Sequence, residues 1–142
     1  MRHFFLLLLN LSFFLTCHAE QIVWSGEVNS NGTPTVSIPL VLGQKYQIKA
    51  SGIVNLGKWW QQGKPFANDA CYEFNPQLTP TALQTLKNSL NLPLGDGSYH
   101  INHVYESAPF MAVQSGIHFW IYDTNYADNS GSLHVEILKL EN

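Results

Sequence analysis

The sequence predicts an all-β fold of the β-sandwich type. Several short segments alternate apolar and polar residues or are rich in β-branched and aromatic ones. Clusters of Gly, Asn, Ser and Pro separate these segments, and only one stretch has the spacing of a helix. Short strands joined by turns are typical of a sandwich, whose loops gather at its ends, where binding sites are usually built.

Strand signals cover most of the chain after residue 20. The expected strands span residues 22–28, 35–40, 45–54, 69–74, 99–105, 116–123 and 132–140. Asn31-Gly32 is the strongest hairpin-turn signal between them. The two clearest alternations, in the third and last of these segments, place on one side of their strands Tyr46, Ile48, Ala50, Leu133, Val135 and Ile137.

The single helical signal covers residues 80–91. Thr79 is a suitable N-cap, and Pro80 fits the first helical position. Three leucines then follow at helical spacing, so one face would pack on the body of the domain: Leu83, Leu86 and Leu90. The sequence therefore predicts one short helix inserted among the strands.

The first 19 residues have the layout of a secretory signal peptide. A short basic start precedes an apolar run over 4–15, and small residues precede a cut after Ala19. The apolar run is shorter than the roughly 20 residues that a membrane span needs. We expect a cleaved signal over 1–19, a mature domain over 20–142 and export to the periplasm or beyond. Acylation of Cys17 is the alternative, although Thr16 stands where a smaller residue is usual.

The composition of the chain limits the classes of partner that we expect it to bind. The formal charge is −3 and no basic patch occurs, which argues against nucleic acid. No second apolar run is long enough to cross a membrane. Cys71 would be the only cysteine left after cleavage, so the mature chain has no intrachain disulfide, and we expect a buried, inert thiol.

Reaction motifs are absent from the sequence. No nucleophile elbow occurs, and the acidic residues are too few and scattered to indicate a glycosidase pair. His100 and His103 are three residues apart, which would place them on opposite faces of a strand and not as a metal pair. We therefore expect a protein that is not an enzyme.

The loop over residues 123–131 is the strongest candidate for a metal site. It holds Asp123, Asn125, Asp128 and Asn129, four oxygen-bearing side chains within seven positions. Calcium takes six to eight oxygen ligands, and the loop has no Cys or His to favour zinc. The pattern is not an EF-hand. The same residue types also form turns for local reasons, so the spacing leaves both interpretations open.

A second polar stretch, residues 55–68, is predicted to be a long functional loop. It contains Trp60, Gln61 and Gln62 beside a second tryptophan, Trp59. Aromatic faces stack on sugar rings and amides bond sugar hydroxyls, and exposed tryptophan is unusual unless it binds something. The alternative is that one of the two tryptophans closes the end of the sandwich.

Both ends of the mature chain resemble the LecA-type calcium-dependent bacterial galactose-binding lectins. Residues 121–123 and 128–131 (Ile-Tyr-Asp and Asp-Asn-Ser-Gly) are similar to that family's Ile-Tyr-Asn-Asp and Asn-Asn-Ser-Gly. Residues 24–28 (Trp-Ser-Gly-Glu-Val) are similar to its Trp-Lys-Gly-Glu-Val opening. The middle of the chain matches badly, although a Gly and a Trp within residues 57–59 can be lined up, and 80–91 is an insertion relative to those lectins. Asp128 stands where the family has Asn, and the family's sugar-reading His and Gln have no clear match.

This resemblance implies a jelly-roll-like β-sandwich of the galactose-binding-domain type with one calcium at its end. Asp123, Asp128 and Asn129 would be the side-chain ligands, and carbonyls near Leu56 and Asn125 would complete the protein's share. The sugar would bind the ion directly and donate hydrogen bonds to Asp123 and Asp128. In place of the family's sugar-reading pair, the loop here offers Trp60, Gln61 and Gln62.

Two functions follow from the sequence. The first is calcium-dependent binding of a glycan or small sugar of galactose type by an exported lectin-like domain. Because single sugar sites bind weakly and linked sites bind more tightly, a homo-oligomer is among the assemblies we expect. The second is a structural or protein-interaction sandwich, calcium-stapled or metal-free, that binds no sugar.

Overall fold

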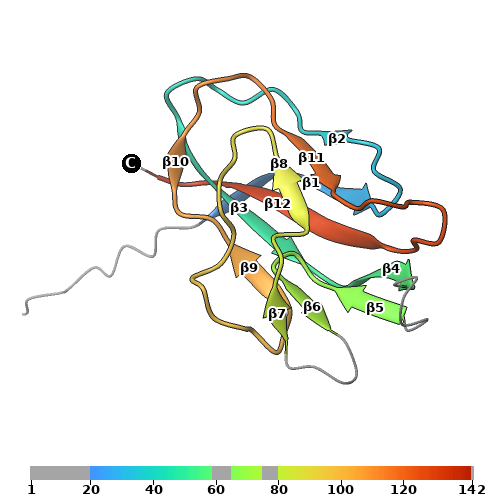
Figure 1. Cartoon of the computed structure of the whole chain (residues 1–142). Coiled ribbons are helices and arrows are strands. Elements are labelled where there is room, and N and C mark those ends of the chain that lie inside the picture. Colours follow the sequence, from blue (N-terminus) through green and yellow to red (C-terminus); the bar gives the residue numbers. More distant parts are fainter. Residues whose placement is uncertain (1–19, 59–64, 75–79, 142) are drawn as a thin grey trace, which may run out of the picture.

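The computed structural model describes residues 20–58, 65–74 and 80–141, and this part of the chain contains twelve strands and no helix (Figure 1). The strands are β1 (Gln21–Asn29), β2 (Thr35–Val36), β3 (Lys45–Ser51), β4 (Val54–Lys58), β5 (Pro65–Asn68), β6 (Tyr72–Phe74), β7 (Thr81–Ala82), β8 (Leu86–Asn88), β9 (Val104–Glu106), β10 (Phe110–Met111), β11 (His118–Ile121) and β12 (Ser132–Lys139). The expected signal peptide lies outside the described residues. Within them, no helix has the length and apolarity needed to cross a membrane.

The largest sheet has the order β1-β12-β3-β10, with β9 paired to β3, and its neighbouring strands are antiparallel. Its two long inner strands alternate buried and partly exposed residues. The predicted inward set is confirmed, since each of Tyr46, Ile48, Ala50, Leu133, Val135 and Ile137 is buried. Leu138, expected on the outer side, is buried as well.

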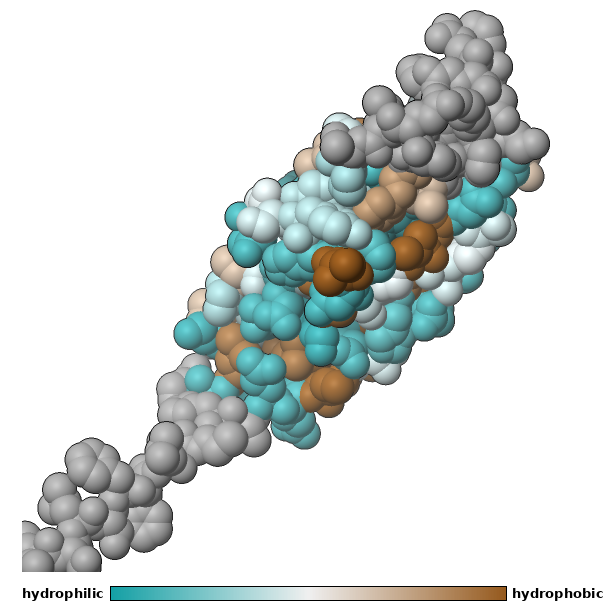
Figure 2. Space-filling model, turned by 90° about the horizontal axis from the view of Figure 1, so that it is seen from below, coloured by the Kyte–Doolittle hydropathy of each residue, from teal (hydrophilic) through white to brown (hydrophobic). Residues whose placement is uncertain are grey.

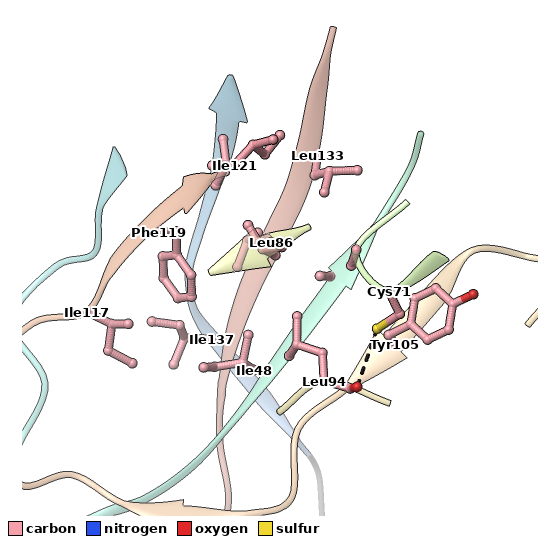
Figure 3. Packing of buried hydrophobic residues seen from close by; sticks show 14 of the residues in the cluster. Ile48, Cys71, Leu86, Leu94, Tyr105, Ile117, Phe119, Ile121, Leu133 and Ile137 are labelled. Atoms are coloured by element: carbon pink, nitrogen blue, oxygen red, sulfur yellow. Dashed lines mark hydrogen bonds between the residues drawn. The ribbon is translucent and has the colours of Figure 1, made fainter. Parts of the chain in front are cut away.

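A second antiparallel sheet, β2-β11-β8, packs its inner side against the first. Phe119 and Ile121 from β11 are fully buried and belong to the same core cluster as Leu133, Ile137 and Ile48 of the large sheet (Figure 3). The ring of Trp24 stacks on Phe119 with 5.7 Å between ring centroids. The result is a β-sandwich-like all-β architecture held by apolar packing between two sheets.

The third sheet, β4-β5-β6-β7, extends the structure beside the sandwich (Figure 1). The predicted long loop over 55–68 is wrong, because β4 and β5 pair as a hairpin in which Val54 faces Asn68. Residues 59–64 lie outside the described residues. The described parts of the predicted loop, residues 55–58 and 65–68, belong to antiparallel strands.

The predicted helix over 80–91 is wrong. Leu83 and Leu86 donate their backbone amides to the Cys71 and Ala70 carbonyls, so these amides bond across to another segment and not along a helix. Leu86 is buried and pairs with Ile121, whereas Leu83 is 47% exposed. Tertiary hydrogen bonding and burial have overridden a weak local helical preference.

The end of the predicted helix is instead a tight turn. Asn88, which is buried, accepts the backbone amides of Leu90 and Leu92 on its Oδ1 and donates its Nδ2 to the Leu92 carbonyl. Asn91 has a positive φ of 53°, which ends any regular helix. A side-chain amide that bonds the local backbone therefore stabilises the turn where periodicity alone indicated a helix.

Two other predicted strands are shorter than expected. Of 35–40 only Thr35–Val36 is strand, and of 99–105 only Val104–Tyr105 belongs to β9. The rest of each segment still bonds to neighbouring backbone, as when Leu40 donates to the Ser115 carbonyl.

The face at the lower edge of Figure 1 is largely hydrophilic outside its grey atoms, with apolar side chains in separate spots (Figure 2). Scattered apolar side chains of this kind are ordinary on protein surfaces.

Candidate functional site

The predicted metal loop, residues 123–131, connects β11 to β12 at one end of the sandwich. The β1–β2 turn and β4 lie at the same end (Figure 1). Ser30 donates its amide to the Gly131 carbonyl at 3.1 Å. The Tyr126 ring lies directly over Gly32, so close that a β-carbon there would overlap it. The predicted Asn31-Gly32 turn thus supports one side of the loop.

The other side of the loop is fastened to β4. Asn55 and Ser130 exchange both backbone hydrogen bonds, at 2.9 and 2.8 Å. Two residues further on, Gly57 has a φ of 77° and lies under the Asp128 carboxylate, with no room for a β-carbon between them. The backbone around Leu56 and the Asp128 side chain, which are 72 positions apart in the sequence, are therefore neighbours.

Within the loop, local hydrogen bonds orient the polar side chains. Asn125 donates its Nδ2 to Asp128 Oδ1 at 3.0 Å and accepts the Ala127 amide on its own Oδ1 at 3.2 Å. We expected the Asn125 backbone carbonyl as a ligand, and the structure adds a role for its side chain, which holds the carboxylate. Asp128 itself is exposed to solvent.

The side-chain amide nitrogen of Asn129 has a hydrogen-bond partner, whereas its amide oxygen has none among the described residues. Its Nδ2 donates to the Ser30 carbonyl at 2.9 Å, which fixes the orientation of the side chain. Its Oδ1 is buried and accepts no hydrogen bond from any described residue. A buried polar atom without a partner costs about 1–3 kcal/mol, so such atoms often mark a missing water or ion. This oxygen belongs to one of the predicted calcium ligands.

Asp123 enters the loop at its first position. Its Oδ1 accepts the Thr124 amide at 2.6 Å, and its own amide donates to the Tyr126 hydroxyl at 3.1 Å. The Tyr126 carbonyl in turn accepts the Asn129 amide at 3.4 Å. These contacts join Asn125 and the backbone next to Leu56 to the Asp128 carboxylate. Tyr126 in turn accepts the backbone amides of Asp123 and Asn129.

The donor set of the loop is made of oxygens. Among the described residues, no group of three or more His, Cys, Asp or Glu side chains is placed to hold a metal ion. The loop has two carboxylates, and the remaining candidate ligands are amide and backbone oxygens. Oxygen ligands of mixed charge suit a hard cation such as calcium. The predicted sugar contacts Trp60, Gln61 and Gln62 lie outside the described residues.

A second polar cluster, which the sequence did not indicate, surrounds Asp69. Its carboxylate is fully buried, and Oδ1 accepts the amides of Cys71 and Tyr72 at 2.8 and 2.5 Å. Oδ2 receives the Tyr105 hydroxyl at 2.9 Å and His103 Nδ1 at 3.0 Å. The two side-chain partners are more than 30 positions away in the sequence, so no local pattern could have revealed them. Both oxygens are fully used, which is typical of a structural carboxylate.

The surroundings of this cluster explain two further side chains. Burial, and then the charge of Asp69, raises the pKa of the Cys71 thiol to about 12. Cys71 Sγ also contacts the Leu94 carbonyl at 3.3 Å (Figure 3). The predicted burial of the thiol is confirmed, and the raised pKa favours the protonated, less reactive form. His100 Nδ1 lies 2.8 Å from the Val104 carbonyl, whereas His103 Nδ1 bonds Asp69, so the two histidines have different partners.

No family model, characterised protein or solved structure gives a significant match in comparisons of this chain with known proteins. The resemblance to the LecA-type lectins therefore stays a prediction that rests on the residues quoted above.

Proposed function

We propose that this chain is an exported, non-enzymatic, calcium-dependent carbohydrate-binding protein with a jelly-roll-like sandwich of the galactose-binding-domain type. The observation that carries the proposal is the buried, unpartnered Oδ1 of Asn129, which follows Asp128 directly in the chain. A buried acceptor without a donor, in a loop that also carries two carboxylates, is chemistry that a divalent cation can satisfy.

The proposed calcium would be held by Asp123, Asp128 and Asn129 side chains and by backbone carbonyls near Leu56 and Asn125. The fixed contact between Gly57 and the Asp128 carboxylate supports this set, because it keeps the β4 backbone within reach of that side chain. Calcium would supply the positive charge that offsets the two carboxylates and would leave open positions in its shell.

Two sugar hydroxyls would fill those open positions. Asp123 and Asp128 would accept hydrogen bonds from the same hydroxyls, which fixes the orientation of the sugar ring. Trp60, Gln61 and Gln62 would add further contacts; in the sequence they follow β4, which borders the loop through Asn55. The galactose-type preference rests on the family resemblance alone.

A thermal melt with calcium, with magnesium and with EDTA tests the ion. A ligand that binds only the folded state stabilises it by about 2.7 kcal/mol at 100 times its Kd. We expect calcium to raise the melting temperature and Asp123→Ala to abolish the rise. An unchanged melt in calcium would remove the proposed ion and, with it, the direct sugar bridge.

A glycan array probed in calcium and in EDTA tests the sugar. We expect galactose-terminated glycans to retain the wild-type protein only in calcium and to release Asp123→Ala. A protein that calcium stabilises but no glycan retains would instead be the calcium-stapled structural or protein-interaction sandwich.

A further inference from the structure

The outer side of the β2-β11-β8 sheet carries a depression of about 540 Å³. Its lining residues are Gly32, Pro34, Ser89, Gln114, His118 and Trp120. On β11, Phe119 and Ile121 are buried in the sandwich, so the alternate positions His118 and Trp120 face outward on this side. The depression is therefore built on a rigid strand whose opposite face is locked into the core.

The polar wall of the depression is held by a chain of hydrogen bonds. Ser89 Oγ accepts the His118 amide at 3.1 Å and Gln114 Nε2 at 3.0 Å. Gln114 Nε2 also donates to the Gly116 carbonyl at 2.7 Å, so both of its hydrogens are used. This leaves the Ser89 hydroxyl hydrogen and Gln114 Oε1 without partners among the described residues. One donor and one acceptor are thus fixed in place before any ligand binds.

The apolar wall is formed by Trp120 and Pro34. Trp120 is half-buried, which leaves part of its indole in contact with solvent. No Asp, Glu, Lys or Arg is among the lining residues of the depression. A ligand that matches an aromatic surface, fixed neutral donors and acceptors and no charge is itself neutral, with an apolar face and a hydroxylated edge. A pyranose ring has these properties.

We infer that this depression is a second saccharide-binding site, for a neutral pyranose, and that it needs no calcium. The Trp120 indole stacks on the C–H face of the ring, and Ser89 Oγ, Gln114 Oε1 and the His118 ring bond its hydroxyls. Gly32, which lines the depression, lies under the Tyr126 ring of the metal loop, so the two sites share the β1–β2 turn. The inference does not rest on the proposed calcium site.

Chemical-shift titration of the tryptophan indole N–H signals in EDTA tests the inference. The probes are methyl galactoside, methyl mannoside, methyl N-acetylglucosaminide, maltose and cellobiose. The chain has four tryptophans, and Trp120→Phe identifies the Trp120 signal. We expect at least one probe to shift that signal. Isothermal titration calorimetry with the same probe then compares the variants, and the affinity should be about tenfold lower in Trp120→Ala because the stacking contact is lost.

Matched variants separate this site from general effects. Ser89→Ala and Gln114→Ala remove one hydrogen bond each and should weaken binding by about three- to tenfold. Tyr122→Ala removes an exposed aromatic side chain outside the depression and should leave the affinity unchanged. Trp120→Phe keeps an aromatic ring in the sheet and should retain part of the affinity if Trp120→Ala fails to fold.

Three results would overturn the inference. The first is that no probe shifts the Trp120 signal in EDTA. The second is binding that survives unchanged in Trp120→Phe and in Gln114→Ala. The third is a Trp120 shift that occurs only with calcium, which would assign the sugar to the metal loop and support the proposed function while it removes this second site.

Discussion

Two carboxylate-centred regions of this protein differ in how completely their oxygens are used. Asp69 is fully buried and accepts four hydrogen bonds. Asp128 is exposed at the sandwich end, and the adjacent Asn129 keeps a buried oxygen without a partner. A saturated carboxylate has no capacity left for a ligand, whereas the loop holds one buried acceptor, Asn129 Oδ1, that no described residue bonds. The first arrangement stabilises the fold and the second is suited to binding.

Removal of the Asp69 carboxylate should have the largest effect on stability. Asp69→Ala leaves the Tyr105 hydroxyl, His103 and two backbone amides without their acceptor inside the protein. We expect the free energy of unfolding to fall by about 3 kcal/mol or more, measured by urea denaturation. The matched control is Asp96→Ala, whose side chain is 65% exposed and should change stability far less. A small loss in Asp69→Ala would contradict its structural role.

A pair of glycine variants sharpens the comparison at the metal loop. Gly57 and Gly43 both have a φ of 77°, but only Gly57 lies against Asp128, and nothing lies within 4 Å of a β-carbon at Gly43. Either substitution to Ala should cost about 1–2 kcal/mol from backbone strain. Gly57→Ala should in addition displace the carboxylate and abolish the calcium-induced rise in melting temperature. The idea fails if Gly43→Ala and Gly57→Ala respond to calcium alike.

Asn129→Ala should distinguish a binding residue from a structural one. It removes the hydrogen bond to the Ser30 carbonyl but also removes the unpartnered buried oxygen, and these two effects oppose each other. We expect unfolding in EDTA to change by about 1 kcal/mol or less, while the stabilisation by calcium is lost. A large loss of stability in EDTA would show that Asn129 acts as Asp69 does.

Glu27 is hydrogen-bonded, as Asp69 is, but its side chain is exposed. Its replacement should therefore have the smallest effect on stability. Hydrogen bonds from Ser132 and then His134 lower the pKa of its carboxyl below the ordinary 4.5. A carboxyl with a lowered folded pKa stabilises the fold above its unfolded pKa, and this contribution disappears as the pH falls through the folded value. Because the side chain is 55% exposed, we expect less than about 1 kcal/mol.

The contribution of Glu27 to the free energy of unfolding is measured by urea denaturation of wild type and Glu27→Gln at pH 7 and pH 3. The stability difference between them should be present at pH 7 and shrink as the pH falls. Ser132→Ala should reproduce part of the effect, and the double variant should add little to Glu27→Gln because the two residues share one hydrogen bond. Fully additive losses would exclude this coupling.

The accuracy of the sequence predictions differs between strands and connections. Strands β3 and β12 were predicted with the right inward faces, because a two-residue alternation directly reflects burial on one side of a sheet. The helix over 80–91 was wrong, because three leucines at helical spacing carry no information about the Cys71 and Ala70 carbonyls that bond this segment. Asp69 was missed for the same reason, since its partners come from another strand and a distant turn.

The candidate site divides in the same way. The four oxygen-bearing side chains of the 123–131 loop were identifiable by composition, but their ability to act together depends on the contact of Asp128 with Gly57 and on the burial of Asn129 Oδ1. The outward face of Trp120 follows from alternation along β11, whereas the Ser89 and Gln114 partners that complete its depression come from two other segments.

The sequence by itself determined the all-β class, the inward faces of the long strands and the position of an oxygen-rich loop before the last strand. These properties depend on residue type and on neighbours within a few positions, and both can be read directly from the sequence. Only the tertiary structure decided which carboxylate is saturated, which amide oxygen is left over and which side chains meet across strands. Such properties depend on pairs of residues far apart in sequence, whose approach is set by packing of the whole core.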